Sequence, residues 1–218
     1  MGTPTSEPLT EERWLRLVER ALSHFDGAAP AAIRGAIASW LAQLDGWRHK
    51  VDLTAARSAE ELVDLMLADA MLLARHVPQA SRVVDVGSGA GAPGLPLGLL
   101  RSDLAVTLVE PKLKRAALLR AAVGQLATRS GWEAKIAVEQ VRLEQLGDRR
   151  YDAAVSRATL SPPDWLASGA RLAPAGEVWV LLARQPAPTL DGWAVARDLH
   201  YRWPFTWVER RAVCYRRL

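Results

Sequence analysis

The residues with the clearest chemical meaning form a glycine-rich stretch, DVGSGAGAPG, at positions 85–94. Gly87, Gly89 and Gly91 satisfy the D-x-G-x-G-x-G pattern that follows the first strand of many methyltransferases. The same stretch also satisfies the dinucleotide pattern G-x-G-x-x-G. In both patterns, glycines let the backbone approach a ligand where a Cβ atom would collide. Residues 85–94 therefore predict a loop that binds a nucleoside-containing cofactor.

Two acidic residues beside this loop bear on which cofactor it binds. Asp85 precedes the first glycine, where a carboxylate opposes a pyrophosphate but suits the cationic methionine end of S-adenosylmethionine. Glu110 ends the next apolar run, where an acid can accept hydrogen bonds from the ribose hydroxyls of either cofactor. A chain of 218 residues also leaves little room for the separate substrate domain of a dehydrogenase. We therefore expect S-adenosylmethionine, held by Asp85, Gly87, Gly89, Gly91 and Glu110.

Short apolar runs that alternate with helical segments must position this loop. The runs lie at 82–87, 104–110, 134–141, 151–158 and 177–183. Strand–helix repetition with near-continuous apolar strands predicts an α/β fold with a doubly wound, Rossmann-like parallel sheet that is covered on both faces. The turn signal around Trp203 lies between two longer alternating runs and predicts a C-terminal antiparallel β-hairpin.

The first eighty residues have helical periodicity instead. Thr10 and Ser58 are placed to cap helices, and Pro30 occupies a tolerated first-turn position. We therefore divide the chain into an N-terminal helical extension, residues 1–80, and a cofactor-binding domain, residues 81–218, and expect the two to pack as one unit.

Composition bounds the class of protein and its partners. The net charge is +4, from 28 Lys and Arg against 24 acids, and the pI is near 9.6, which leans toward a polyanionic partner but also fits an ordinary solvated surface. A single cysteine, Cys214, excludes an internal disulfide framework. It is predicted to be a small core residue. The N-terminus lacks a signal peptide, no apolar run reaches membrane-spanning length, and the histidines show no metal-ligand spacing. We expect a cytoplasmic protein that binds neither membrane nor metal.

The segment DVGSGAGAPGLPL, with its Pro-Gly-x-Pro after the glycines, resembles the first motif of the bacterial small-subunit ribosomal RNA guanine-N7 methyltransferases, also called glucose-inhibited division protein B. VDLTAARSAEEL, KRAALLR, RLEQL and VSRA resemble further segments of that family, so the resemblance covers almost the whole chain. It implies a class I S-adenosylmethionine-dependent methyltransferase that modifies N7 of a guanine in 16S ribosomal RNA, either free or in the assembled small subunit. Guanine N7 has a free lone pair and no proton, so no general base is required.

The resemblance also implies roles for single residues. Gly87 would contact the cofactor, Leu143 and Glu144 would border its adenine, and Arg157 would face both the cofactor and the incoming base. The alternative for Arg157 is an arginine at a strand end that pairs with Asp152 or with solvent.

Cations before the helix that Ser58 caps, and others near the strand ends, could hold RNA phosphates around the pocket. The candidates are Arg48, Lys50, Arg57, Lys114 and Arg115.

The chain departs from the family pattern at several positions. Asp52 stands in place of asparagine, Met66 and Ala70 in place of histidine and serine, and Ala92 in place of an aromatic residue beside the cofactor; Arg184 lies where a Lys-Gly pair is absent. A small-molecule methyltransferase and a catalytically relaxed RNA-binding paralogue therefore stay open as alternatives.

Two aromatic features have structural interpretations. SPPDW, residues 161–165, resembles the Pro-Pro-aromatic motif of amino-methyltransferases but is predicted to begin a helix, with its prolines in the first turn. Trp14, Trp40 and Trp179 are predicted to be core residues rather than platforms for base stacking.

Overall fold

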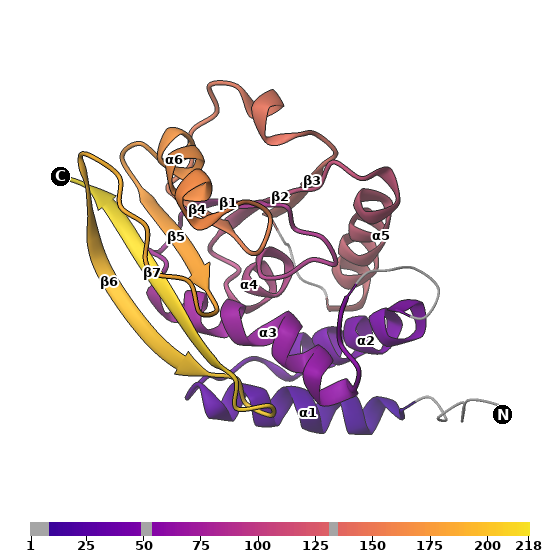
Figure 1. Ribbon diagram of the computed structural model, residues 1–218. Helices are drawn as coiled ribbons and strands as arrows, with labels where there is room; N and C mark the ends of the chain where they lie inside the picture. Colours follow the sequence, from indigo (N-terminus) through magenta and orange to yellow (C-terminus); the bar gives the residue numbers. More distant parts are fainter. Residues whose placement is uncertain (1–8, 49–53, 131–134) are drawn as a thin grey trace, which may run out of the picture.

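The computed structural model describes residues 9–48, 54–130 and 135–218 and shows one mixed sheet with helices on both faces (Figure 1). Within that part of the chain the sheet has seven strands in the order β3-β2-β1-β4-β5-β7-β6. The first five strands are parallel: β1 Arg82–Val86, β2 Ala105–Val109, β3 Lys135–Glu139, β4 Ala153–Ser156 and β5 Glu177–Leu182. The predicted parallel sheet is confirmed, and each strand lies within the apolar run that predicted it.

The helices that precede β3 lie on one face of this sheet. They are α1 Glu11–His24, α2 Ala31–Arg48, α3 Ala59–His76, α4 Gly94–Leu100 and α5 Leu113–Ser130. The helix α6, Pro162–Leu172, lies on the opposite face, together with the short 3-10 helix η1, Leu143–Leu146 (Figure 1). The expected two-faced covering is present, but the second face carries much less helix than the first.

The predicted helix starts are also confirmed. The Thr10 side chain accepts a hydrogen bond from the backbone N–H of Arg13, and that of Ser58 accepts one from Glu61. Pro30 immediately precedes α2, which ends at Arg48.

One hydrophobic core joins the N-terminal helices to the sheet. Trp14, Trp40 and Trp179 are each no more than 2% exposed and belong to this core, as predicted. Cys214 is buried in the same core, where burial raises the pKa of its thiol to about 12. In the described part of the chain, no helix is both long and apolar enough to cross a bilayer.

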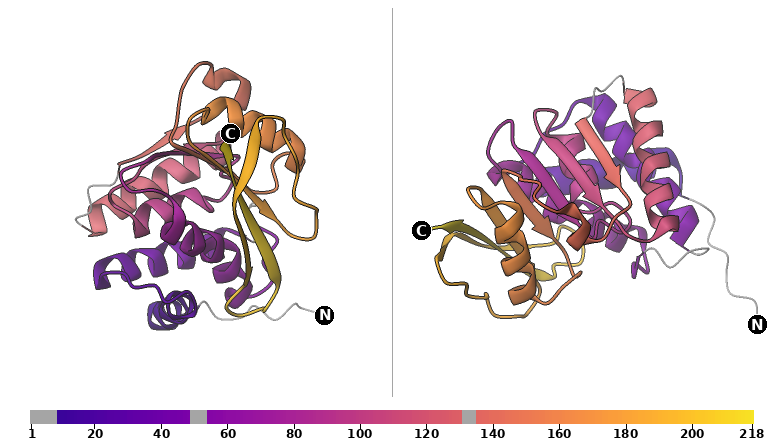
Figure 2. Two further views of the ribbon diagram at one scale, coloured as in Figure 1. Left: turned by 90° about the vertical axis from the view of Figure 1, so that its left-hand side faces the viewer. Right: turned by 90° about the horizontal axis from the view of Figure 1, so that it is seen from above.

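The predicted C-terminal hairpin is present and extends the sheet at one end, opposite α5 (Figure 2). It consists of β6 Trp193–Arg202 and β7 Glu209–Arg217, and β7 inserts antiparallel between β5 and β6.

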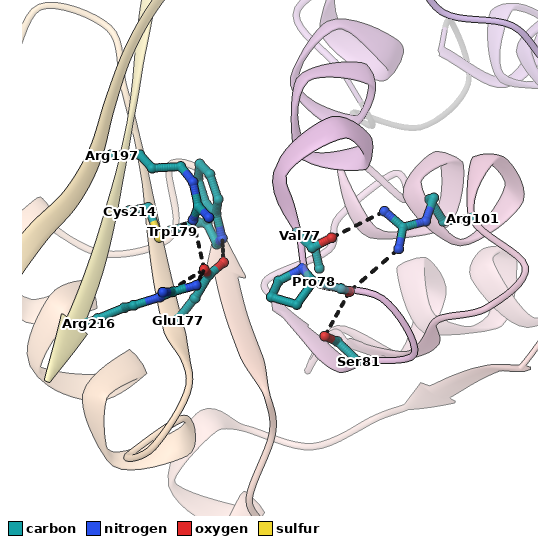
Figure 3. Close-up of polar contacts among 9 residues, drawn as sticks. All are labelled: Val77, Pro78, Ser81, Arg101, Glu177, Trp179, Arg197, Cys214 and Arg216. Carbon is teal, nitrogen blue, oxygen red and sulfur yellow. Dashed lines mark hydrogen bonds and ion pairs between the residues drawn. The ribbon is translucent and has the colours of Figure 1, made fainter.

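Buried acids hold the hairpin in place near both of its ends. Glu177 accepts hydrogen bonds from Trp179 Nε1 at 3.0 Å, from Arg197 Nη1 at 2.8 Å and from Arg216 Nε at 3.1 Å (Figure 3). At the turn, the carboxylate of Asp64 on α3 accepts from the backbone N–H groups of Phe205 and Thr206, at 3.1 and 2.8 Å. The hairpin is therefore fixed both to β5 and to α3.

Candidate active site

The glycine loop leaves the carboxyl end of β1 in a conformation that favours glycine. Gly87, Gly89 and Gly91 have φ angles of +76°, +58° and +121°. A Cβ atom added to Gly87 would lie 2.0 Å from the Thr159 hydroxyl oxygen. The chain after β4 therefore crosses so close to Gly87 that a side chain has no space there.

A cavity of about 500 Å³, hereafter the cofactor cavity, opens beside this loop at the carboxyl ends of β1, β2 and β4. Ligands of wound α/β folds collect at this edge of the sheet. Its walls come from the glycine loop, the segments after β2 and β4, and the region of α3: Thr54, Ala55, Leu65, Met66, Gly87, Ser88, Gly89, Ala90, Ala92, Glu110, Pro111, Lys112, Arg115, Arg157, Ala158 and Thr159.

Glu110 lines the cofactor cavity and ties the glycine loop to β2. It is 3% exposed, and its two carboxylate oxygens accept hydrogen bonds from the backbone N–H groups of Gly89 at 3.0 Å and Lys112 at 2.9 Å. Each oxygen has a second lone pair, so the carboxylate can accept further bonds. The structure thus places Glu110 where a ribose diol could reach it.

Asp85 lies behind the loop and does not line the cofactor cavity. Strand alternation turns its fully buried side chain toward α4, where Oδ2 accepts from the backbone N–H of Gly94 at 2.9 Å. Oδ1 has no hydrogen-bond partner among the described residues. Burial is the main cause that raises the pKa of Asp85 to about 6. A direct contact between Asp85 and the cofactor stays a prediction. The structure favours an indirect effect, in which Asp85 holds the end of the glycine loop through Gly94.

A second cavity, of about 430 Å³, continues from the cofactor cavity along the other side of Gly87 and Thr159. Leu143 and Glu144, which the resemblance assigns to the adenine, line it from η1. The structure brings these two residues next to the glycine loop although more than fifty positions separate them in the sequence.

Arg157 follows β4 and is held by α3. Its Nη1 donates to Asp69 Oδ2 at 3.1 Å and to the Leu65 carbonyl. The alternative pairing with Asp152 is wrong, since Asp152 contacts Arg82 instead. The next residue, Ala158, has a φ of +55°, an unusual conformation for a residue with a side chain, and it lies in the wall of the cofactor cavity.

Asp69 and Tyr201, which no sequence motif identified, complete this arrangement. Asp69 is 2% exposed, and its Oδ1 accepts from the Tyr201 hydroxyl of β6 at 2.6 Å. Burial and the charge of Asp69 raise the pKa of Tyr201. An acid within the apolar helix segment ELVDLMLADAMLL is the signal that could have identified Asp69.

The predicted phosphate-binding cations lie in different positions. Arg115 lines the cofactor cavity, and Lys114 is exposed near the start of α5. Arg57 is exposed just before α3, and Arg48 ends α2. Lys50 lies outside the described residues.

The departures from the family pattern also differ in their surroundings. Met66 and Ala92 line the cofactor cavity, and Ala70 is buried on α3. Arg184 lies after β5, where its backbone N–H donates to the Gln185 side chain. Asp52 lies outside the described residues.

SPPDW begins α6, as predicted. Ser161 caps the helix, Pro162 is its first residue, and Trp165 is 2% exposed with its Nε1 donating to the Trp179 carbonyl. The motif is therefore structural here. The described residues contain no cluster of His, Cys, Asp and Glu side chains that could hold a metal ion.

Comparison with known proteins identifies relatives of this chain. The family model GidB, rRNA small subunit methyltransferase G, matches residues 34–188. Ribosomal RNA small subunit methyltransferase G of Anaeromyxobacter dehalogenans (strain 2CP-C) is 38% identical over 156 residues, which cover 71% of this chain and 72% of the relative. The protein of the same name from Myxococcus xanthus (strain DK1622) is 33% identical over 183 residues, which cover 80% and 84%.

A solved structure supports the fold. The 1,6-didemethyltoxoflavin-N1-methyltransferase of Burkholderia thailandensis, with 1,6-didemethyltoxoflavin and S-adenosylhomocysteine bound, is similar with a TM-score of 0.51 and 16% identity. The match covers 100% of this chain and 93% of that one. At this identity the likeness shows the fold, a Rossmann-like methyltransferase sheet.

Proposed function

The chain belongs to the GidB family of rRNA small subunit methyltransferase G, and from this premise we propose that it methylates N7 of a guanine in 16S ribosomal RNA with S-adenosylmethionine as methyl donor. The observation that carries the proposal is the cofactor cavity, in which the glycine loop, Glu110 and Arg157 meet at one edge of the sheet.

The residues of this cavity fit the cofactor. Gly87 and Gly89 line the cavity, and they have no side chains that would keep a ligand away from the backbone. Behind the loop, the unpartnered Oδ1 of Asp85 is a buried acceptor that favours a nearby cation. Glu110 would bind the ribose, and Leu143 and Glu144 would border the adenine. S-adenosylmethionine, when bound, supplies an electrophilic methyl group on a sulfonium.

The chain's own task is then to align the acceptor. In-line transfer depends on orientation more than on covalent help. Guanine N7 offers a lone pair and carries no proton, so no side chain has to remove one. This agrees with the cavity, since none of the described residues that line it is a histidine or a cysteine. Arg157, fixed by Asp69, is positioned to orient the base.

The RNA partner is supported by the cations around the site. Lys112 and Arg115 line the cofactor cavity, and Lys114 is exposed beside them. Such cations can neutralise phosphates while the target base enters the pocket unpaired. A substrate of small-subunit RNA, free or assembled, supports a cytoplasmic location for the protein.

The decisive experiment maps N7-methylguanosine in small-subunit RNA from cells with and without this protein. Loss of one N7-methylguanosine, restored by the purified protein and S-adenosylmethionine, is the expected result. Arg157→Ala should lower kcat by about tenfold or more because the acceptor loses its alignment. Arg171→Ala, on the exposed side of α6, is the control and should leave kcat unchanged. Methylation of an exocyclic amine or of a metabolite would refute the proposal.

A further inference from the structure

A third cavity, of about 230 Å³, lies against the cofactor cavity and has a different composition. The two share Leu65, Arg157 and Ala158. The far wall comes from the C-terminal hairpin, through Tyr201, Trp203 and Arg210, so we call it the hairpin cavity. The rest of the lining consists of Asp69, Gln185 and the apolar residues Leu160, Pro162, Leu181, Leu182 and Ala183. A mostly apolar cavity with an aromatic wall, next to the methyl donor, suits a flat base better than a solvated phosphate.

The polar groups of the hairpin cavity that lack partners are hydrogen-bond donors. Trp203 is 5% exposed, and its Nε1–H has no partner in the described part of the chain. Arg157 uses Nη1 for Asp69 and Leu65, while its Nε and Nη2 groups have no partner among the described residues. The side-chain acceptors are already engaged, because both carboxylate oxygens of Asp69 and the amide oxygen of Gln185 receive hydrogen bonds.

Free donors select the edge of a purine that carries acceptors. The Hoogsteen edge of guanine presents N7 and O6, both acceptors, whereas that of adenine presents N7 and a donating N6 amino group. A guanine whose O6 meets these donors would turn the adjacent N7 toward the cofactor cavity. An adenine in the same position would set its amino group against the donors, which costs binding energy.

We propose that the hairpin cavity receives the acceptor guanine and that Trp203 Nε1, together with the free donors of Arg157, recognises its O6. This inference rests on the proposed function and specifies how guanine is chosen over adenine. Asp69 and Tyr201 are positioning residues that hold Arg157. Arg210, whose guanidinium lies 4.0 Å from the centre of the Trp203 ring, holds the indole.

The test compares Trp203→Phe, which keeps an aromatic ring but removes the donor, with Trp207→Phe. Trp207 lies in the same hairpin turn, is 58% exposed and does not line the cavity. The substrates are small subunits reconstituted with ribosomal RNA that carries either guanine or 2-aminopurine, which lacks O6, at the mapped nucleotide. On guanine RNA, Trp203→Phe should lower kcat/KM by about 3- to 10-fold, the scale of one hydrogen bond, and Trp207→Phe should not change it. On 2-aminopurine RNA, the wild type should lose activity, and Trp203→Phe should lose no more.

Two outcomes would overturn the inference alone. One is an equal penalty for Trp203→Phe on both RNAs, which would mean that the indole contacts a phosphate or acts only on the fold. The other is a wild type that methylates both RNAs equally well, a comparison that needs no variant and stays informative even if Trp203→Phe unfolds. Thermal denaturation and S-adenosylmethionine binding report whether the variants are folded. A wild type that does not methylate guanine N7 would instead refute the proposed function.

Discussion

Replacing Asp85 with asparagine should stabilise the free protein at neutral pH while weakening its binding of S-adenosylmethionine. The carboxylate is fully buried, with one hydrogen bond from Gly94 and one oxygen without a partner. Burial therefore opposes its ionisation and raises its pKa from 3.8 to about 6. Asparagine has the same shape but no charge, so its burial does not carry the cost of burying a carboxylate.

The magnitude follows from the pKa. Each pKa unit corresponds to about 1.4 kcal/mol, so ionised Asp85 destabilises the folded state by about 3 kcal/mol above pH 6. Because the folded state binds the proton more tightly than the unfolded state, this group's contribution is most favourable below pH ~4 and is lost as pH rises through about 6. Asparagine gives a weaker, uncharged hydrogen bond to Gly94, which offsets about 1 kcal/mol. We expect a net gain of about 2 kcal/mol at pH 8 from these two terms.

Urea unfolding of the wild type and Asp85→Asn, in parallel from pH 4 to pH 8, measures this effect. The difference in unfolding free energy should grow by about 2.4 kcal/mol between pH 4 and pH 7 in favour of Asp85→Asn. Asp191→Asn, at an exposed position, should show no such growth. Calorimetry should show about tenfold weaker binding of S-adenosylmethionine to Asp85→Asn at pH 8, since a buried negative charge no longer favours the cation. A pH-independent difference in stability would refute the reasoning.

Three further substitutions test the rest of the site. Gly87→Ala should abolish S-adenosylmethionine binding and lower Tm, because its Cβ would meet Thr159 at 2.0 Å. Gly124→Ala, with open space on α5, is the control and should keep binding and raise Tm slightly. Equal behaviour of the two variants in calorimetry would contradict this. Glu110→Ala should weaken the cofactor by about 1 to 3 kcal/mol in the same assay, and equal wild-type affinity for a 2′,3′-dideoxy analogue would argue against the ribose contact. Lys114→Ala should raise KM for RNA and reduce the slope of log KM against log salt by about 1; an unchanged slope would remove Lys114 from the phosphate contacts.

The sheet and the cofactor loop were accessible from the sequence because their signals are local. Apolar runs of strand length, each followed by a turn signal, placed the carboxyl edge where Gly87 and Glu110 meet. The direction of the Asp85 side chain also has a local cause, the alternation of a strand, but the position of the acid before the glycines suggested a contact with the ligand instead. The motif suggested that Asp85 contacts the ligand, whereas strand alternation turns its side chain toward α4.

The hydrogen bonds around Arg157 could not be predicted in the same way. Asp69 and Arg157 are 88 positions apart, and Asp69 and Tyr201 are 132 apart. Such pairs depend on how α3, β4 and the hairpin pack together, which no periodicity specifies. The same holds for the hairpin cavity, whose lining residues are separated by up to two-thirds of the chain.

The order of the cavity walls along the chain has a consequence during synthesis. Every described residue that lines the cofactor cavity precedes residue 160, but the hairpin cavity also needs the side chains of Tyr201, Trp203 and Arg210. A ribosome makes the chain from its N-terminus, so the walls of the cofactor cavity have left the exit tunnel before the last wall of the hairpin cavity emerges. If the acceptor base enters the hairpin cavity, a nascent chain can assemble a place for the methyl donor before it can receive RNA.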